Sequence, residues 1–289
     1  MTLFSSLRRA VLSAVITLTV VVSPATAQER IVSIGGDITE ILFALEAGDR
    51  VVAADSTSLY PQATEALPKV GYLRQLSAEG VLSAEPDLII ISGAAGPETA
   101  LELLRASGVP IVEMDTEYSV NAIIEKTAKT AEAVGQAEAG QALIETIKAD
   151  WGEATTLMDS LSFAPKALFV AATEDGAARA AGAKTAADGV IRLMRGNNVF
   201  EEFNGYKTLS LEGAVAADPD IIIMMTHHAD RVGGKGAVKD HPALSLTRAA
   251  QNGDIYFVDQ LEVMQFSPRT PKAIARLVEE IAERRATKQ

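Results

Sequence analysis

The chain contains one sequence unit twice: Leu76–Ile91 reads LSAEGVLSAEPDLIII, and Leu209–Met224 reads LSLEGAVAADPDIIIM. The two copies align without a gap. In each copy a serine precedes a short helix as its N-cap, and a glutamate lies in the first turn, where the helix dipole favours negative charge. Proline then stops the helix, and aspartate leads into an apolar strand. A unit repeated in this order predicts two similar lobes in one protein, and small-molecule sites favour the interface between such lobes.

Strands and helices alternate around each copy of this unit. The run Asp87–Ser92 (DLIIIS) is apolar at consecutive positions, which is typical of a strand covered on both faces. Strands separated by helices predict parallel pairing through βαβ crossovers, so we expect an α/β fold of two Rossmann-like lobes with mainly parallel sheets. The other predicted strands are Ile31–Ile34, Val51–Ala53, Pro110–Met114, Lys166–Ala172, Ile221–Thr226 and Ile255–Asp259, and the predicted helices include Glu98–Ala106, Thr185–Met194 and one from about Pro271.

A long helical stretch separates the two lobes. From Tyr118 to Leu161, Ala, Glu, Lys, Ile and Leu recur at helical spacing, and Gly135 divides the stretch. Its second part would form one helix of about 35 Å at 1.5 Å per residue, either packed in a core or acting as a rigid strut. We therefore expect an N-terminal α/β lobe at 28–136, a connecting helix at 137–161 and a C-terminal α/β lobe at 162–289.

Residues 1–27 have the features of a secretory signal peptide. Arg8 and Arg9 supply a positive start, Ala10–Val22 is apolar, and the small-x-small triplet ATA ends at Ala27. The apolar run is shorter than the roughly 20 residues that a membrane-spanning helix needs. We expect cleavage after Ala27 and a soluble, exported protein in the periplasm.

The composition excludes several classes of protein. The chain has 26 Lys and Arg against 38 Asp and Glu, a net charge of −12, 48% hydrophobic residues and no cysteine. The apolar fraction is too high for a disordered chain, and the acidic balance argues against a nucleic-acid binder. The lack of cysteine excludes disulfides, thiolate zinc sites and a lipoprotein anchor. Because catalytic motifs such as Gly-x-Ser-x-Gly and His-Glu-x-x-His are also missing, we do not expect an enzyme, and three histidines make a poor zinc receptor.

Four stretches resemble a known family. They are Ile31–Leu42 (IVSIGGDITEIL), Val70–Gly80 (VGYLRQLSAEG), Ala181–Asp188 (AGAKTAAD) and Tyr206–Gly213 (YKTLSLEG). In this order they resemble the solute-binding proteins of bacterial ABC importers that have one rigid helix between two α/β lobes (class III, the helical-backbone type). The match is closest to periplasmic hemin-binding proteins of haem importers. The resemblance implies a protein that binds haem b as its transported ligand in the inter-lobe cleft; a ferric siderophore or a corrinoid on the same scaffold is the alternative.

The resemblance also implies which residue binds the iron. In the family the tyrosine of the VGYxR stretch binds ferric haem iron, and this tyrosine corresponds to Tyr72. A phenolate is a hard anionic donor suited to Fe(III), although a free phenol has a pKa near 10. Arg74 lies two residues on and would favour the anion, and Tyr60 is the rival ligand. Some relatives add a histidine from the second lobe, where this chain has Thr173 instead.

Other cleft residues are predicted less directly. His227 or His228, after the strand Ile221–Thr226, is a candidate for the sixth iron ligand, although two loop histidines without a metal are the simpler interpretation. Met264 and Phe266 suit the apolar face of a porphyrin but could equally belong to the core, and Gly36 would let a ligand approach backbone N–H groups or would simply form a tight strand-to-helix turn. After Gly36, Asp37 with Glu40 three residues later forms a helix-start signature. Met225 is a further cleft residue, with core as the simpler interpretation, and Arg231, Lys235 and Arg269 are cations that the sequence alone does not assign to haem propionates.

Glu79 and Glu212 occupy equivalent positions of the repeated unit. By themselves they complement helix dipoles. In the resembling class, paired glutamates on the two lobes meet arginines of the membrane permease, and a rigid strut would fix their separation. The resemblance thus implies an inner-membrane permease and its ATPase as partners, with an outer-membrane haem receptor upstream.

Overall fold

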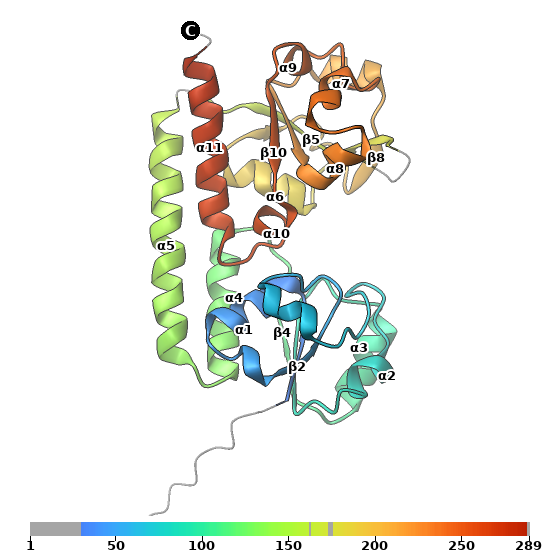
Figure 1. Cartoon of the computed structure of the whole chain (residues 1–289), viewed down its shortest axis with the longest axis vertical. Helices are drawn as coiled ribbons and strands as arrows, with labels where there is room; N and C mark the ends of the chain where they lie inside the picture. The colour runs from blue at the N-terminus through green and yellow to red at the C-terminus, as the bar shows by residue number, and fades with distance from the viewer. Residues whose placement is uncertain (1–29, 162, 173–175, 288–289) are drawn as a thin grey trace, which may run out of the picture.

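The computed structural model describes residues 30–161, 163–172 and 176–287, and Figure 1 shows two lobes stacked beside a layer of long helices. The predicted signal peptide at 1–27 and Thr173 lie outside the described residues. Among the described residues, no helix combines the length and the apolarity that crossing a bilayer requires.

The N-terminal lobe is built on a four-stranded parallel sheet in the order β2-β1-β3-β4. Side chains of β3 alternate between two cores: Leu88 and Ile90 pack with α1 and α4 (Val120–Ala133), whereas Ile89 and Ile91 pack with α2 and α3. This confirms the prediction of a strand covered on both faces. The elements are β1 (Ile31–Ile34), α1 (Gly36–Ala44), η1 (Gly48–Arg50), β2 (Val51–Ala54), η2 (Gln62–Ala66), α2 (Ala78–Leu82), β3 (Leu88–Ile91), α3 (Glu98–Ala106) and β4 (Ile111–Glu113).

The C-terminal lobe has a mixed sheet in the order β10-β9-β5-β6-β8, with β7 paired to β5. β10, β9, β5 and β7 pair in parallel, while β6 and β8 are antiparallel and were not predicted, because their short polar-apolar runs carry little periodicity. The elements are β5 (Lys166–Ala172), β6 (Ala178–Ala181), α6 (Ala186–Leu193), β7 (Asn197–Asn198), β8 (Tyr206–Thr208), α7 (Leu211–Ala217), β9 (Ile221–Met225), α8 (Thr226–Arg231), η3 (Lys235–Asp240), α9 (Arg248–Gln251), β10 (Ile255–Val258) and α10 (Gln260–Val263).

Three helices join the lobes. Figure 1 shows α5 (Ala137–Ser160) running beside both lobes, with α4 (Val120–Ala133) against its first half and α11 (Thr270–Ala286) against its second. The connecting helix is therefore packed along much of its length. α4 contributes Val120 and Ile123 to the core of the C-terminal lobe and Ala131 to that of the N-terminal lobe. The domain limits 28–136, 137–161 and 162–289 remain a proposal, since α4 belongs to both cores.

The repeated unit folds the same way twice. Ser77 and Ser210 are the N-caps of α2 and α7 and accept hydrogen bonds from the backbone N–H three residues on, which confirms the predicted capping. The aspartates before the strands also match: Asp87 accepts a hydrogen bond from the backbone N–H of Arg30, and Asp220 accepts one from that of Lys166. Each aspartate thus ties its strand to the start of the neighbouring strand in the same sheet.

Candidate functional site

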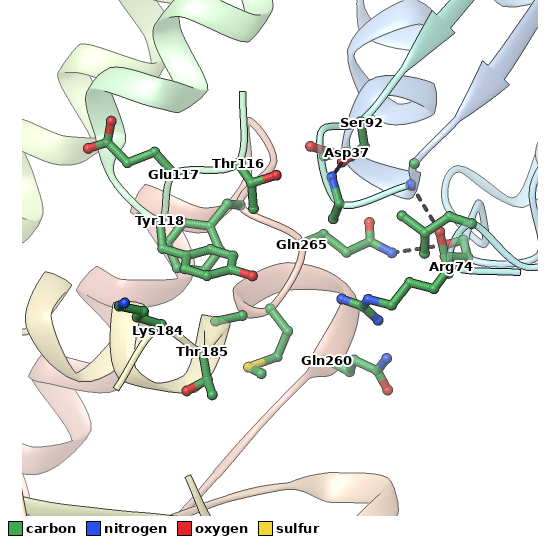
Figure 2. A pocket seen from close by; sticks show the side chains of 18 of the residues that line it. Asp37, Arg74, Ser92, Thr116, Glu117, Tyr118, Lys184, Thr185, Gln260 and Gln265 are labelled. Carbon is green, nitrogen blue, oxygen red and sulfur yellow. Dashed lines mark hydrogen bonds between the residues drawn. The ribbon is translucent and has the colours of Figure 1, made fainter. Parts of the chain in front are cut away.

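A cavity of about 540 Å³ lies between the lobes. Gly35 and Gly36 follow β1, Ser92 follows β3, and Met225 ends β9, so the cavity is at the carboxyl ends of parallel strands, where open α/β sheets bind ligands. Its volume is in the range of small-molecule sites. Figure 2 shows side chains from both lobes around this space, among them Arg74, Tyr118 and Gln265. The lining residues used below are Arg74, Tyr118, Lys126, Lys184, Tyr206, Met264, Gln265 and Phe266.

Tyr72 lies at the edge of this cavity on a short anchored loop. Leu73 and Leu76 are buried in the core of the N-terminal lobe, which turns the side chains of Tyr72 and Arg74 outward. The Arg74 guanidinium donates a hydrogen bond of 2.7 Å to the Tyr72 Oη. Leu73 and Arg74 line the cavity, whereas Tyr72, 38% exposed, lies just outside the lining residues. A phenol oxygen and a cation are thus held together at the cavity rim.

A set of polar contacts crosses the floor of the cavity between the lobes. The buried Lys126 forms an ion pair with Asp37 and donates a hydrogen bond to the Phe266 carbonyl at 3.0 Å. Beside this pair, Arg269 at the start of α11 donates to the buried Glu40 of α1 at 2.8 Å, and its guanidinium lies 3.5 Å from the centre of the Tyr60 ring. These contacts fix one lobe against the other without closing the cavity.

The helix that Asp37 and Glu40 predict does begin here, as α1, but its cap differs from the prediction. Asp37 and Glu40 do not cap the helix: the N-cap is Gly35, without a side-chain cap, and both acids instead form ion pairs with cations from other elements. Gly36 lines the cavity, and its backbone N–H donates a hydrogen bond of 3.2 Å to the Thr57 hydroxyl, so its contact with a ligand stays a prediction. A Cβ on Gly36 would lie 2.4 Å from the Gln265 amide nitrogen, which donates to the Thr57 carbonyl at 3.0 Å. Gly36 therefore makes room for Gln265 of the other lobe.

An aromatic wall bounds the cavity on the side of the C-terminal lobe. Tyr118 packs on Phe266 with ring centres 5.0 Å apart, and Phe266 itself is buried in the core, so Tyr118 stands in front of it. Tyr206 and Met264 are half-buried and complete this wall. Burial raises the pKa of the Tyr206 phenol, with a smaller rise from Tyr118. The sequence pointed to Met264 as a lining residue but to neither tyrosine, although Tyr206 opens the stretch Tyr206–Gly213 that resembles the family.

The histidines and most of the predicted cations are elsewhere. His227 and His228 belong to α8, their ring centres are 4.2 Å apart, and neither lines the cavity. Burial lowers the pKa of both, to about 4 for His228. Arg231 donates to the Ala172 carbonyl, and Lys235 lies over the ring of Phe257. In the part of the chain that the structure describes, no three His, Asp or Glu side chains gather in a way that would hold a metal ion.

Glu79 and Glu212 lie in the first turns of α2 and α7, and both are exposed. Figure 1 shows these helices on the side of each lobe away from α5. The repeat thus presents two carboxylates at equivalent places of the two lobes, joined through one packed helical layer.

A family model described as periplasmic binding protein matches residues 31–261. The chain belongs to the periplasmic binding protein family. The solved structures that resemble this binding protein include the periplasmic heme-binding protein RhuT from Roseiflexus sp. RS-1, which is 35% identical with a TM-score of 0.82 over 89% of this chain and 99% of RhuT. Another is the periplasmic heme-binding protein BhuT in complex with two hemes, 35% identical with a TM-score of 0.83 over 88% and 98% of the two chains.

A relative with a different named ligand also matches. The vitamin B12-binding protein of Yersinia pestis is 26% identical over 73% of this chain and 75% of its own length. The resemblance seen in the sequence is confirmed for the family and for the two-lobed fold. The protein is a solute-binding component of an ABC importer rather than an enzyme, and this role implies a permease and an ATPase as partners.

Proposed function

We propose that this binding protein takes up haem b and delivers it to the permease of its importer. The observation that carries the proposal is the Tyr72–Arg74 pair at the rim of the inter-lobe cavity. A phenolate suits ferric iron, and the guanidinium faces the oxygen that would bear the negative charge. The heme-binding names of RhuT and BhuT support the same ligand.

Each residue of the site has a different role in this proposal. Tyr72 is the axial ligand of the iron and Arg74 holds its phenol oxygen, while Met264 offers a polarisable surface to the porphyrin. Phe266 is buried and supports Tyr118 by packing against its ring from the core. Tyr72 is tied to the lining residue Arg74, whereas His227 and His228 lie on α8 and do not line the cavity, so this proposal gives the histidines no role.

The test is an absorption titration of the purified protein with hemin. The wild type should give a high-spin ferric spectrum with a tyrosinate charge-transfer band, and Tyr72→Phe should remove the band and weaken binding by more than about tenfold. Tyr60→Phe is the matched control, since Tyr60 is equally exposed but lies against Arg269. An unchanged spectrum in Tyr72→Phe would place the ligand elsewhere, and a spectral change after replacing both histidines would restore them as ligands.

A corrinoid or a ferric siderophore is the second candidate, and the vitamin B12-binding relative is the observation that favours the corrinoid. Titration with cyanocobalamin under the same conditions separates the two. Binding of cyanocobalamin without binding of hemin would replace the haem proposal by this one.

We also propose that the chain is exported by the signal peptide at 1–27, cleaved after Ala27, and acts in the periplasm, downstream of an outer-membrane haem receptor. Glu79 and Glu212 would then dock onto arginines of the permease. Changing both to alanine should preserve hemin affinity and reduce uptake through the cognate permease. If that double variant instead lost hemin affinity while uptake followed affinity, the docking role would be wrong.

A further inference from the structure

Some of the charged side chains that line the cavity have a partner, whereas Lys184 has no carboxylate partner among the described residues. Asp37 and Lys126 neutralise each other in a buried pair, and Arg74 is directed at the Tyr72 phenol. Lys184, in the C-terminal lobe, also lines the cavity, and among the described residues no carboxylate lies within 4.0 Å of its amine. Figure 2 shows Lys184 below Tyr118, on the opposite side of the view from Arg74.

The acidic residues of the lining do not offset Lys184. The Asp115 carboxylate is highly exposed and lies 3.9 Å from the amine of Lys129, a residue that does not line the cavity. The Glu117 side chain points away from the centre of the cavity in Figure 2. The wall formed by Tyr118 and Lys184 therefore carries an exposed lysine that has no acidic partner within 4.0 Å among the described residues.

The backbone at Lys184 is held in an unusual conformation. Its φ is 59°, in the left-handed region that non-glycine residues rarely adopt. The loop is fixed on both sides, because Gly182 donates to the Gly205 carbonyl at 2.7 Å and Ala183 donates to the Phe203 carbonyl at 2.7 Å. On the other side, Thr185 caps α6 and is buried. Glycine would be less strained here, and the hydrogen bonds of the loop and the cap of α6 hold the lysine in this conformation.

We propose that Lys184 binds a carboxylate of the transported ligand, and that this contact favours a porphyrin with propionate groups over a corrinoid, whose side chains are neutral amides. The proposal rests on the proposed haem function. Arg74 serves the phenol that binds iron, so Lys184 is the lining cation that remains for a propionate. The lysine stem has four rotatable bonds and can follow a propionate within a fixed site. A partly exposed amine–carboxylate pair of this kind changes affinity by about fivefold.

The test compares hemin with hemin dimethyl ester, which lacks both free carboxylates, by absorption titration of the mature full chain. Lys184→Gln should weaken hemin binding about fivefold and leave binding of the ester unchanged, as a coupled pair requires. Lys184→Gly should show the same loss of hemin affinity while the protein stays folded, since glycine adopts this backbone without strain. Lys239→Gln, which removes an exposed charge of the same lobe away from the cavity, should change neither affinity.

Three outcomes would overturn the inference. Equal hemin affinity in the wild type and Lys184→Gln would overturn it while leaving the haem function intact. An equal loss for hemin and for the ester would also overturn it, because Lys184 would then act without a carboxylate. Failure of the wild type to bind hemin at all would overturn both the haem function and this inference.

Discussion

Replacing Arg269 by methionine should lower the stability of the folded protein, because Arg269 forms an ion pair between the two lobes. Arg269 of the C-terminal lobe and Glu40 of the N-terminal lobe form an ion pair of 2.8 Å, and their side chains are 27% and 4% exposed. Without the arginine, the Glu40 carboxylate is left in the interior with no counter-charge. The guanidinium also lies 3.5 Å from the centre of the Tyr60 ring, a contact that methionine does not replace electrostatically.

The expected cost follows from these contacts. Breaking a buried ion pair by removing one partner costs about 3 to 5 kcal/mol, and the partial exposure of Arg269 places this pair at the lower end. Loss of the cation–π contact adds about 0.5 kcal/mol. The free energy of unfolding should therefore fall by about 3 to 4 kcal/mol, which lowers Tm by about 6 to 10 °C for a chain of this size.

Urea denaturation and thermal unfolding followed by circular dichroism measure this loss. The double variant Glu40→Gln with Arg269→Met should recover more than half of it, because the unpaired carboxylate is then gone. A fall of less than about 1 kcal/mol in Arg269→Met would refute the reasoning, since the pair would then contribute no more than a surface salt bridge.

Two further perturbations test the same physical arguments. Gly36→Ala should displace Gln265 and lower Tm, because the new Cβ would lie 2.4 Å from the amide nitrogen. The control Gly152→Ala, in an open part of α5, should stabilise the protein by about 0.5 to 1 kcal/mol. Equal thermal shifts in the two variants would contradict the close contact of Gly36 with Gln265. Because burial lowers the pKa of His228 to about 4 from 6.5, the unfolded chain binds the additional proton between these values. Stability should therefore be full above pH 6.5 and fall progressively toward pH 4, and a flatter urea-midpoint profile in His228→Gln would confirm the sign while an identical profile would contradict it.

The sequence alone predicted those features that depend on neighbouring residues. Ser77 and Ser210 cap their helices by accepting a hydrogen bond from the backbone N–H three residues on. The continuous apolar run at Leu88–Ile91 is buried on both faces of its sheet. The pairing of Tyr72 with Arg74 was predictable for the same reason, since two residues along one loop can meet without help from the rest of the fold.

The tertiary structure alone decided how the lobes meet. Arg269 and Glu40 are 229 positions apart, and Lys126 reaches the carbonyl of Phe266 across 140 positions, so no local pattern in the sequence links either pair. Lys184 lies in the stretch Ala181–Asp188 that resembles the family, but no pattern in the sequence marks it as a cation of the cavity, where hydrogen bonds hold its loop against Gly205. Local hydrogen bonds and periodic burial depend on residues that are close in the sequence and can be predicted from it. The geometry of the cavity instead depends on which distant segments the packed helices bring together.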